Sequence, residues 1–198
     1  MSTDKQKDIA REIARRYITL SMEGLDSLAN ILVPIKARRG TVILDEGEMC
    51  NAMYYVERGL IRQFYNKNGR EVTEHISYEG GMVICIESYF LRQPTIIKVQ
   101  ALENSLLYAL PHDQMHELMK SSYEFCRLQL AILQHSLILS QQKADTLRFE
   151  TAKERYMRTL REHPDIIRRA PLHHVASFLQ MTPETLSRVR SSAEESDI

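Results

Sequence analysis

The sequence predicts an α+β protein. An antiparallel β-roll of the jelly-roll type, also called a double-stranded β-helix, is followed by one long helix and a small all-α module. Short runs rich in β-branched and aromatic residues, separated by turn signals, fill the chain from about residue 39 to residue 110. Beyond Pro111 the apolar residues recur three and four apart, and neither Gly nor Pro interrupts residues 123–149. We therefore divide the chain into N-terminal helices with a β-roll at 1–111, a short and a long helix at 112–149, and a C-terminal helical module at 150–198.

The composition is that of an ordinary globular chain. Of 198 residues, 43% are hydrophobic and 26% are charged, and 26 basic side chains balance 26 acidic ones. This balance excludes a histone-like polycation and an acidic disordered chain. No apolar run approaches the roughly 18 residues that span a bilayer, and Met1 to Arg16 lacks the apolar stretch of a secretory signal. We therefore expect a cytoplasmic protein without a membrane partner. Cys50, Cys85 and Cys126 are odd in number and far apart, which argues against a disulfide framework and against an iron–sulfur cluster.

The N-terminal pattern is helical and then changes to strands. Ile9, Ile13 and Tyr17 recur four apart, and this helical region is expected to reach about Val33, where Pro34 stops it. Strands are expected at 41–44, 53–56, 60–65, 71–76, 95–102 and 106–110, with Asn68-Gly69 as the hairpin turn between the third and the fourth.

The long segment predicts a helix with two apolar stripes. One stripe has heptad spacing, and Phe125, Ile132 and Leu139 form a second, offset stripe. A helix with two apolar stripes needs two neighbours, so we expect the β-roll on one side and a second copy of the chain on the other. The alternative is that both stripes pack within one chain. The predicted seam of the homodimer consists of Tyr123, Cys126, Leu130, Leu133, Leu137 and Ala144.

The C-terminal module combines positive charge with the pattern of a helix-turn-helix. Residues 151–190 carry eight basic and four acidic side chains, so this part stands at +4 although the whole chain is neutral. A solvated, arginine-rich surface is the alternative explanation. Leu172 to Leu179 provide one apolar helix face, and Thr182-Pro183 follows a short connection as an N-cap and first helical residue. An ordinary helical hairpin would share this pattern, but the short turn and the small Ala176 favour a helix-turn-helix.

In such a motif the second helix enters the major groove of double-stranded DNA with its N-terminal residues at the base edges. Arg188 can donate two hydrogen bonds to guanine, and Glu184 can accept one from cytosine. Arginines before the motif would contact phosphates, and a histidine at the start of its first helix would contact phosphate or water. The predicted DNA-binding residues are Thr182, Glu184, Thr185, Ser187, Arg188, Arg190, Arg168, Arg169 and His173.

Three stretches carry a resemblance to a known family: Gly40 to Glu48, Tyr54 to Arg62 and Val175 to Arg190. With the order of β-roll, long helix and helix-turn-helix, the chain resembles the CRP/FNR family of bacterial transcription regulators from about Met22 onward. The resemblance implies a cyclic-nucleotide-binding-like sensor domain and a dimer. It also implies that the operator is faced by residues at the places of Glu184, Thr185 and Arg188.

Departures from the family pattern predict that cyclic AMP is not the effector. Relatives that bind it carry a Gly-Glu pair for the ribose and a downstream Arg for the phosphate, whereas this chain has Ile84-Cys85 and no arginine around Pro94 to Ile96. A buried cyclic phosphate without a cation would be costly. We expect no cofactor and leave the identity of the effector open. Haem bound by one of several scattered histidines stays possible as an effector. Cys85 is either a redox-sensitive thiol or a buried inert one. An effector pocket would be formed by Met82, Ile84, Cys85, Glu87, Ser88 and Thr95.

The leading hypothesis is therefore a homodimeric, sequence-specific DNA-binding transcription regulator. It is not expected to be an enzyme, because we find no nucleophile–base motif, no Gly-rich phosphate loop and no cluster with metal-ligand spacing. Two-fold symmetry predicts a near-palindromic operator, with RNA polymerase as a further candidate partner. After Arg190 we expect no two-stranded wing, only a short acidic tail. The alternative is a ligand-binding or protein-interaction protein whose degenerate helix-turn-helix no longer reads DNA.

Overall fold

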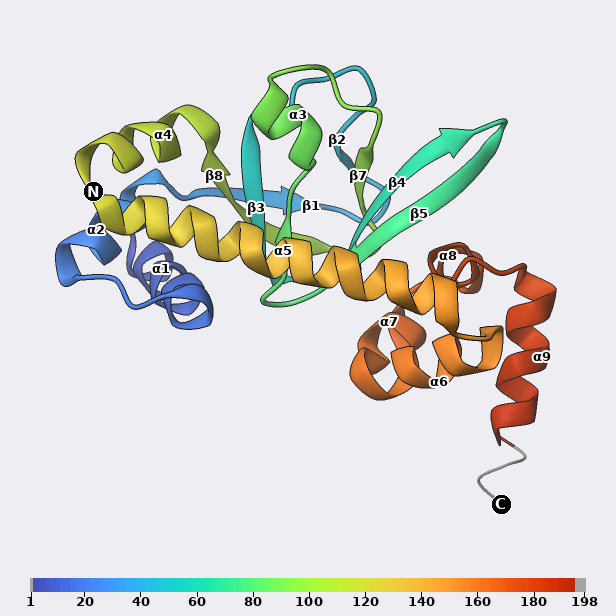
Figure 1. Ribbon diagram of the computed structural model, residues 1–198. Helices are drawn as coiled ribbons and strands as arrows, with labels where there is room; N and C mark the ends of the chain where they lie inside the picture. The colour runs from blue at the N-terminus through green and yellow to red at the C-terminus, as the bar shows by residue number, and fades with distance from the viewer. Residues whose placement is uncertain (1, 195–198) are drawn as a thin grey trace.

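The computed structural model describes residues 2–194 and arranges them along one long helix (Figure 1). The acidic tail was expected at 191–198, but residues 191–194 continue helix α9, and residues 195–198 lie outside the described residues. The helices are α1 (Asp4–Tyr17), α2 (Met22–Ile31), α3 (Ile86–Leu91), α4 (His112–Ser121), α5 (Tyr123–Phe149), α6 (Ala152–Glu162), α7 (Pro164–Arg169), α8 (Leu172–Phe178) and α9 (Pro183–Glu194). The strands are β1 (Val33–Ala37), β2 (Val42–Leu44), β3 (Ala52–Arg58), β4 (Ile61–Lys67), β5 (Arg70–Ser77), β6 (Met82–Val83), β7 (Lys98–Ala101) and β8 (Ser105–Pro111).

The strands form two four-stranded sheets, ordered β1-β8-β3-β6 and β2-β7-β4-β5, with antiparallel neighbours throughout. Together with the helices that follow, they confirm the predicted α+β class and the β-roll. The hairpin between β4 and β5 turns at Asn68 and Gly69, whose φ angles of 52° and 77° are those of the tight turn that this dipeptide favours.

Three local predictions are wrong. The N-terminal helices end at Ile31, and the next residues form β1, because they pair with β8 far along the chain. The strand expected at 95–102 is limited to β7. Helix α3 forms where no helix was expected; it has only six residues and ends at Arg92 with φ of 52°. A pattern that depends on periodicity cannot detect so short a helix.

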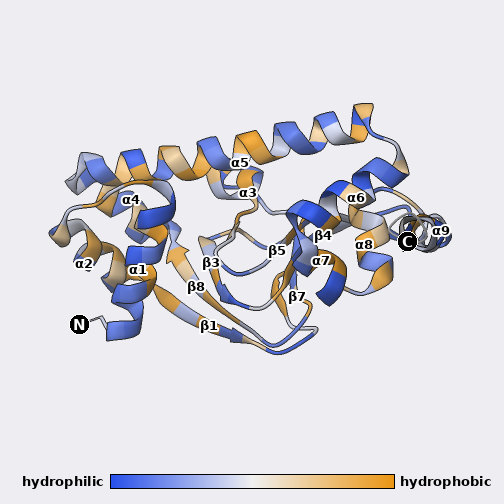
Figure 2. Ribbon diagram, turned by 90° about the horizontal axis from the view of Figure 1, so that it is seen from below, coloured by the Kyte–Doolittle hydropathy of each residue, from blue (hydrophilic) through white to orange (hydrophobic). Residues whose placement is uncertain are grey.

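Helix α5 runs along one side of the molecule, with α1 and α2 at one end and the C-terminal helices at the other (Figures 1 and 2). Its first half packs on the main core, where Phe125, Leu128 and Ile132 are at most 2% exposed. This confirms the offset apolar stripe over that half, whereas Leu139 further along is 43% exposed. Within residues 2–194, no helix has both the length and the apolar character needed to cross a membrane.

The C-terminal helices have a core of their own and also dock on the β-roll. Ile166 of α7 is buried in a separate cluster with Leu60, Ile76 and Leu102 of the roll. The module's position relative to the roll therefore rests on apolar packing as well as polar contacts. The module's own core is formed by Tyr156, Val175, Ala176, Leu179 and Leu186.

Candidate nucleic-acid interface and effector region

The turn between α8 and α9 is held in place by one arginine of α6. Gln180 in this turn has φ of 50°, in the left-handed region where glycine is the usual residue. Arg155 donates from Nε to the backbone oxygen of Leu179 at 2.8 Å and from Nη1 to that of Glu150 at 2.7 Å. Sequence patterns did not reveal Arg155, because its partners are backbone carbonyls, one of them 24 residues away.

Helices α8 and α9 have the connectivity and close packing of a helix-turn-helix. Ala176 and Leu186, at 0% and 1% exposure, are buried between them. The Thr182 side-chain oxygen accepts the backbone N–H of Thr185 at 3.2 Å, as expected for an N-cap. The predicted cap and turn are therefore present, and the inward-facing positions are buried or half-buried except Leu172, which is 44% exposed.

The residues expected to read DNA lie on the outer face of α9. Arg188 donates from Nη2 to the Thr185 hydroxyl at 3.4 Å, and it forms no ion pair with any residue of the described chain. Hydrogen bonds with its own backbone and with Thr182 lower the pKa of Glu184, so this carboxylate stays an acceptor. The face therefore offers both a cationic donor and an anionic acceptor to base edges. Thr185 is half-buried, and Thr182, Glu184, Ser187, Arg188 and Arg190 are exposed.

Two further predicted residues extend this face. Arg168 is exposed, and together with Arg190 it lines a small cavity of about 170 Å³ between α7, α8 and α9. The two arginines are the only charged residues of this lining, which is otherwise formed by Tyr156 and apolar side chains. His173 is exposed in the first turn of α8, and its ring centre lies 4.0 Å from that of His174.

Arg169 corrects the sequence-based expectation for this arginine pair. Its guanidinium donates to Glu79 at 2.7 and 2.8 Å and to Glu103 at 2.6 Å, and its side chain is only 25% exposed. The hydrogen bonds from Arg169 lower the pKa of Glu79 to about 2. Two ionised partners thus hold Arg169 against the β-roll, so in this arrangement it is not free to bind a phosphate. Neighbouring residues of α7 therefore have different roles.

Helix α8 docks on β5, which is the edge strand of its sheet. The Thr73 backbone N–H donates to the Ser177 hydroxyl at 2.9 Å, and that hydroxyl donates to the Glu71 carbonyl at 3.2 Å. The Tyr78 hydroxyl lies 2.9 Å from Nδ1 of His163. These contacts satisfy backbone groups that an edge strand leaves open. Ser177 and His163 have no distinctive local pattern, so the sequence did not identify this docking.

The predicted dimer seam lies along the side of α5 that the β-roll leaves open. Tyr123, Leu130 and Leu137 are 78%, 54% and 69% exposed, and they follow one another at heptad spacing. Cys126, Leu133 and Ala144 of the same seam are half-buried. A row of exposed large apolar side chains on one helix face is typical of a surface that another protein covers.

The six residues predicted to form an effector pocket lie around the N-terminus of α3. Of these, Ser88 accepts the Cys50 backbone N–H at 2.9 Å and donates to the Gln93 carbonyl at 2.6 Å, while Thr95 binds the backbone of Ile97. Their polar groups are therefore satisfied within the protein. Ile84, Cys85, Ser88 and Thr95 are buried, Met82 is half-buried and Glu87 is exposed.

The arginine nearest to this region is also occupied. Arg92 donates from Nη1 to the carbonyls of Cys50 and Tyr89 at 3.2 and 3.4 Å, and from Nη2 to Oδ1 of Asn51 at 2.6 Å. It connects the end of α3 to the segment before β3. Among residues 2–194, no group of three or more His, Cys, Asp or Glu side chains is placed to hold a metal ion.

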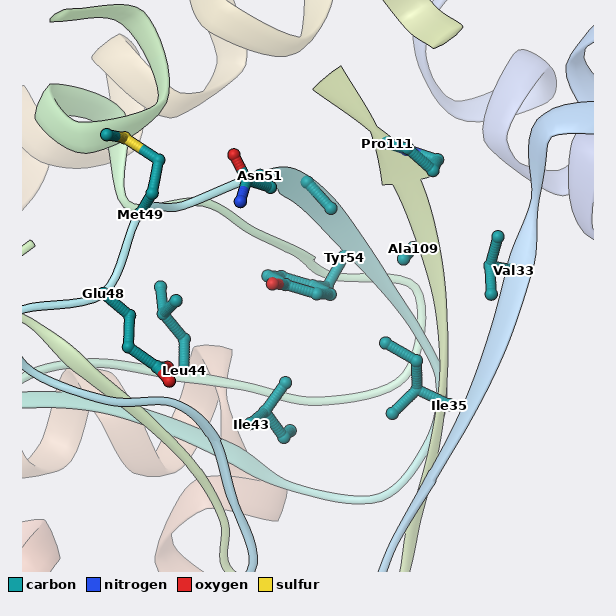
Figure 3. A pocket seen from close by; sticks show the side chains of 11 residues that line it. Val33, Ile35, Ile43, Leu44, Glu48, Met49, Asn51, Tyr54, Ala109 and Pro111 are labelled. Carbon is teal, nitrogen blue, oxygen red and sulfur yellow. The ribbon is translucent and has the colours of Figure 1, made fainter. Parts of the chain in front are cut away.

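A larger cavity, of about 430 Å³, opens at the end of the roll formed by β1, β2, β3 and β8 (Figure 3). Tyr54 projects into it and is 7% exposed, and Glu48 lies at its border. The walls are mostly aliphatic, and no lysine, arginine or histidine contributes to them. None of the six predicted pocket residues lines it. The other lining residues are Val33, Ile35, Ile43, Leu44, Met49, Asn51, Ala52, Ala109 and Pro111.

Comparisons with known proteins agree with this architecture. Residues 34–122 match the protein family described as the cyclic nucleotide-binding domain. No protein with a curated description matches the sequence. The chain thus contains a domain of the cyclic nucleotide-binding class followed by a helix-turn-helix.

Solved structures identify the architecture more closely. FixK2 from Bradyrhizobium japonicum is similar with a TM-score of 0.74 at 17% identity, over 85% of this chain and 87% of that one. The catabolite activator protein of Thermus thermophilus has a TM-score of 0.57 at 22% identity, over 94% and 88%. A regulator assigned to the crp/fnr family from Eubacterium rectale has a TM-score of 0.66 at 16% identity, over 89% and 85%. The chain has the fold of the CRP/FNR regulators, as the resemblance implies.

Proposed function

We propose that this protein is a homodimeric, sequence-specific DNA-binding transcription regulator of the cytoplasm and has no enzymatic activity. The observation that carries the proposal is the outer face of α9. It presents Arg188 and Glu184 to solvent at the end of a capped, tightly packed helix-turn-helix. These side chains have the chemistry that distinguishes bases in the major groove. Arg168 and Arg190 beside one hollow add a position for the DNA backbone.

The homodimer is the second part of the proposal. The exposed side chains of Tyr123, Leu130 and Leu137 have the heptad spacing of a two-stranded coiled coil. Pairing of two α5 helices would bury this row and relate two α9 helices by two-fold symmetry. The corresponding operator is near-palindromic, with half-sites about one helical turn, or ~34 Å, apart.

We also propose that the sensor domain does not bind cyclic AMP. Ile84 and Cys85 are buried where a ribose and phosphate site would need polar groups. Arg92 already donates to two carbonyls and an amide oxygen, so it provides no free cation for a cyclic phosphate. Placing a phosphate there would leave a buried charge without a counterion.

The test is selection of duplexes from a randomised DNA pool by the purified full-length protein at moderate salt, with and without added cell extract. Enrichment of a palindrome with half-site centres one turn apart supports the proposal. The matched control is Arg188→Ala, which should lose the enriched sequence while retaining general DNA binding. Failure to enrich any sequence under both conditions would reject a DNA-reading function and favour the degenerate helix-turn-helix.

A further inference from the structure

Two of the three cysteines, far apart in the sequence, lie together inside the β-roll. Cys50 precedes β3 and Cys85 precedes α3; both are free thiols, at 0% and 5% exposure. Both belong to one buried core cluster, the Cys50 backbone is bonded to Ser88 of α3 and to Arg92 just after it, and each cysteine side chain acts on the pKa of the other. Cys126 on α5 is separate, and its thiol donates to the carbonyl of Met119 at 3.5 Å.

The surroundings hold these two thiols in place. The Cys50 backbone N–H donates to the Ser88 hydroxyl, one turn after Cys85, at 2.9 Å. The Cys50 thiol donates to the Ala52 carbonyl at 3.3 Å, and the amide of Gln63 lies 4.0 Å from the Cys85 sulfur. Cys50 is thus held by hydrogen bonds to Ser88 and Ala52, and Cys85 lies beside the amide of Gln63.

We propose that Cys50 and Cys85 form a dithiol site that a hydroperoxide oxidises to an intramolecular disulfide. The bond would connect the segment before β3 to the start of α3. Nothing in this proposal depends on DNA binding, so the two can succeed or fail separately.

The two thiols have different roles in the reaction. The Cys85 thiol and the positive charge of Arg92 lower the pKa of Cys50, whereas burial and the neighbouring Cys50 raise that of Cys85. Met49 and Asn51, which flank Cys50, line the cavity of about 430 Å³, whereas neither neighbour of Cys85 does. Cys50 is therefore the thiolate that attacks, and Cys85 is the thiol that resolves.

The oxidation takes place in two steps. The Cys50 thiolate attacks the terminal peroxide oxygen, the O–O bond breaks, and an alcohol or water leaves after taking up a proton. The resulting Cys50 sulfenic acid is attacked by the Cys85 sulfur, which gives up its proton as the S–O bond breaks and water leaves. In total, two thiols and one hydroperoxide give one disulfide, one alcohol or water from the peroxide, and one further water.

A route for a small oxidant is visible in the fold. Met49 and Asn51, which directly flank Cys50, line the cavity of about 430 Å³ at the open end of the roll, and Ala52 and Tyr54 continue its wall (Figure 3). Ala52, whose carbonyl accepts from the Cys50 thiol, is one of the residues that line this cavity. A molecule the size of hydrogen peroxide can therefore come close to the site without unfolding of the domain.

The experiment treats the reduced full-length protein with hydrogen peroxide, alkylates the remaining thiols and maps them by mass spectrometry. We expect the free thiols to fall from three to one, with Cys126 alkylated and a peptide joining Cys50 to Cys85. The intact mass should fall by about 2 Da, the two hydrogens lost on disulfide formation. Retention of three alkylated thiols, or a disulfide that joins Cys126 residues of two copies instead, would overturn the proposal.

Matched variants assign the roles. Cys126→Ser should still form the disulfide, whereas Cys50→Ser should leave Cys85 reduced. In Cys85→Ala, a sulfenic acid at Cys50 should accumulate and react with dimedone. Circular dichroism of each reduced variant checks that the fold is kept. Dimedone labelling of Cys85 in Cys50→Ser, with none of Cys50 in Cys85→Ala, would reverse the assigned roles and contradict the proposal as stated.

Discussion

The two faces of the C-terminal module differ in what satisfies their charges. On the face formed by α7 and α8, Arg169 is paired with two glutamates of the β-roll and Ser177 bonds to the edge strand β5. On the outer face of α9, Arg188 is exposed and donates to the hydroxyl of Thr185 on the same helix. The first face is engaged within the chain, and the outer face of α9 is the one that we propose to contact DNA.

A positive net charge of a module therefore does not by itself identify a nucleic-acid surface. Arg168 and Arg169 are adjacent and chemically identical, yet only Arg168 is exposed. The +4 charge of residues 151–190 is therefore divided between intrachain docking and a free surface. Arg169 is held on the β-roll because the carboxylates of Glu79 and Glu103 both bind its guanidinium.

The largest expected effect comes from the predicted dimer seam, because the proposed near-palindromic operator would be read by two α9 helices together. Leu137→Asp would place a charge in the paired helices, where burial without a partner is costly. We expect monomers in sedimentation velocity and a loss of operator affinity on the order of 100-fold or more, since each monomer keeps only one half-site.

The control for this prediction is Leu139→Asp, an equally drastic change at an exposed residue of α5 that lies off the seam. It should remain dimeric. A Leu137→Asp protein that stays dimeric would show that the exposed row on α5 is not the interface.

The second largest effect is expected on DNA affinity when Arg188, on the outer face of α9, is replaced. Arg188→Ala should cost about 1–3 kcal/mol on the preferred operator and relax the preference at one base pair. Arg168→Ala should instead weaken binding to all sequences alike and reduce the slope of log affinity against log salt by about 1. Both are measured by fluorescence anisotropy on the selected operator and on a scrambled duplex. Identical effects of the two variants on both duplexes would contradict the separation into base and phosphate contacts.

The docked face should respond to Arg169→Ala. The variant loses hydrogen bonds to Glu79 and Glu103, whose side chains are 39% and 36% exposed, so solvent screening limits the loss to about 1–2 kcal/mol. Local opening should then be about 5- to 30-fold more frequent. The measurement is amide hydrogen exchange at Thr73, whose N–H is bound by Ser177 of the docked helix.

Arg168→Ala is the matched control for docking, because it removes the same side chain one position earlier. It should leave exchange at Thr73 unchanged. Equal protection of Thr73 in the Arg169→Ala protein and the unmodified protein would mean that the ion pairs do not hold the module on the roll.

Features with a local signal were predictable from the sequence, and features made by distant contacts were not. The helix over 123–149 and the cap at Thr182 were located correctly, because periodicity and capping chemistry act within a few residues. Strand β1 was missed because its identity depends on pairing with β8. The docking of Arg169 and the Cys50–Cys85 contact were missed for the same reason: each joins residues that only the tertiary fold brings together.

The smallest expected effect is a pH dependence of the docked face through His174 of α8. Burial, with the positive charges of Arg62 and His173 nearby and only partial compensation by Glu71, lowers the pKa of His174 from 6.5 to about 4. Between these values the unfolded chain binds a proton that the folded protein excludes. The free energy of unfolding should therefore fall as pH drops from about 6.5 toward 4, and this contribution should be absent above pH 6.5. Urea unfolding of His174→Gln across this range should show a shallower dependence than the unmodified protein, whereas His116→Gln, at an exposed position of α4, should keep it. Equal slopes in all three proteins would contradict a contribution from His174.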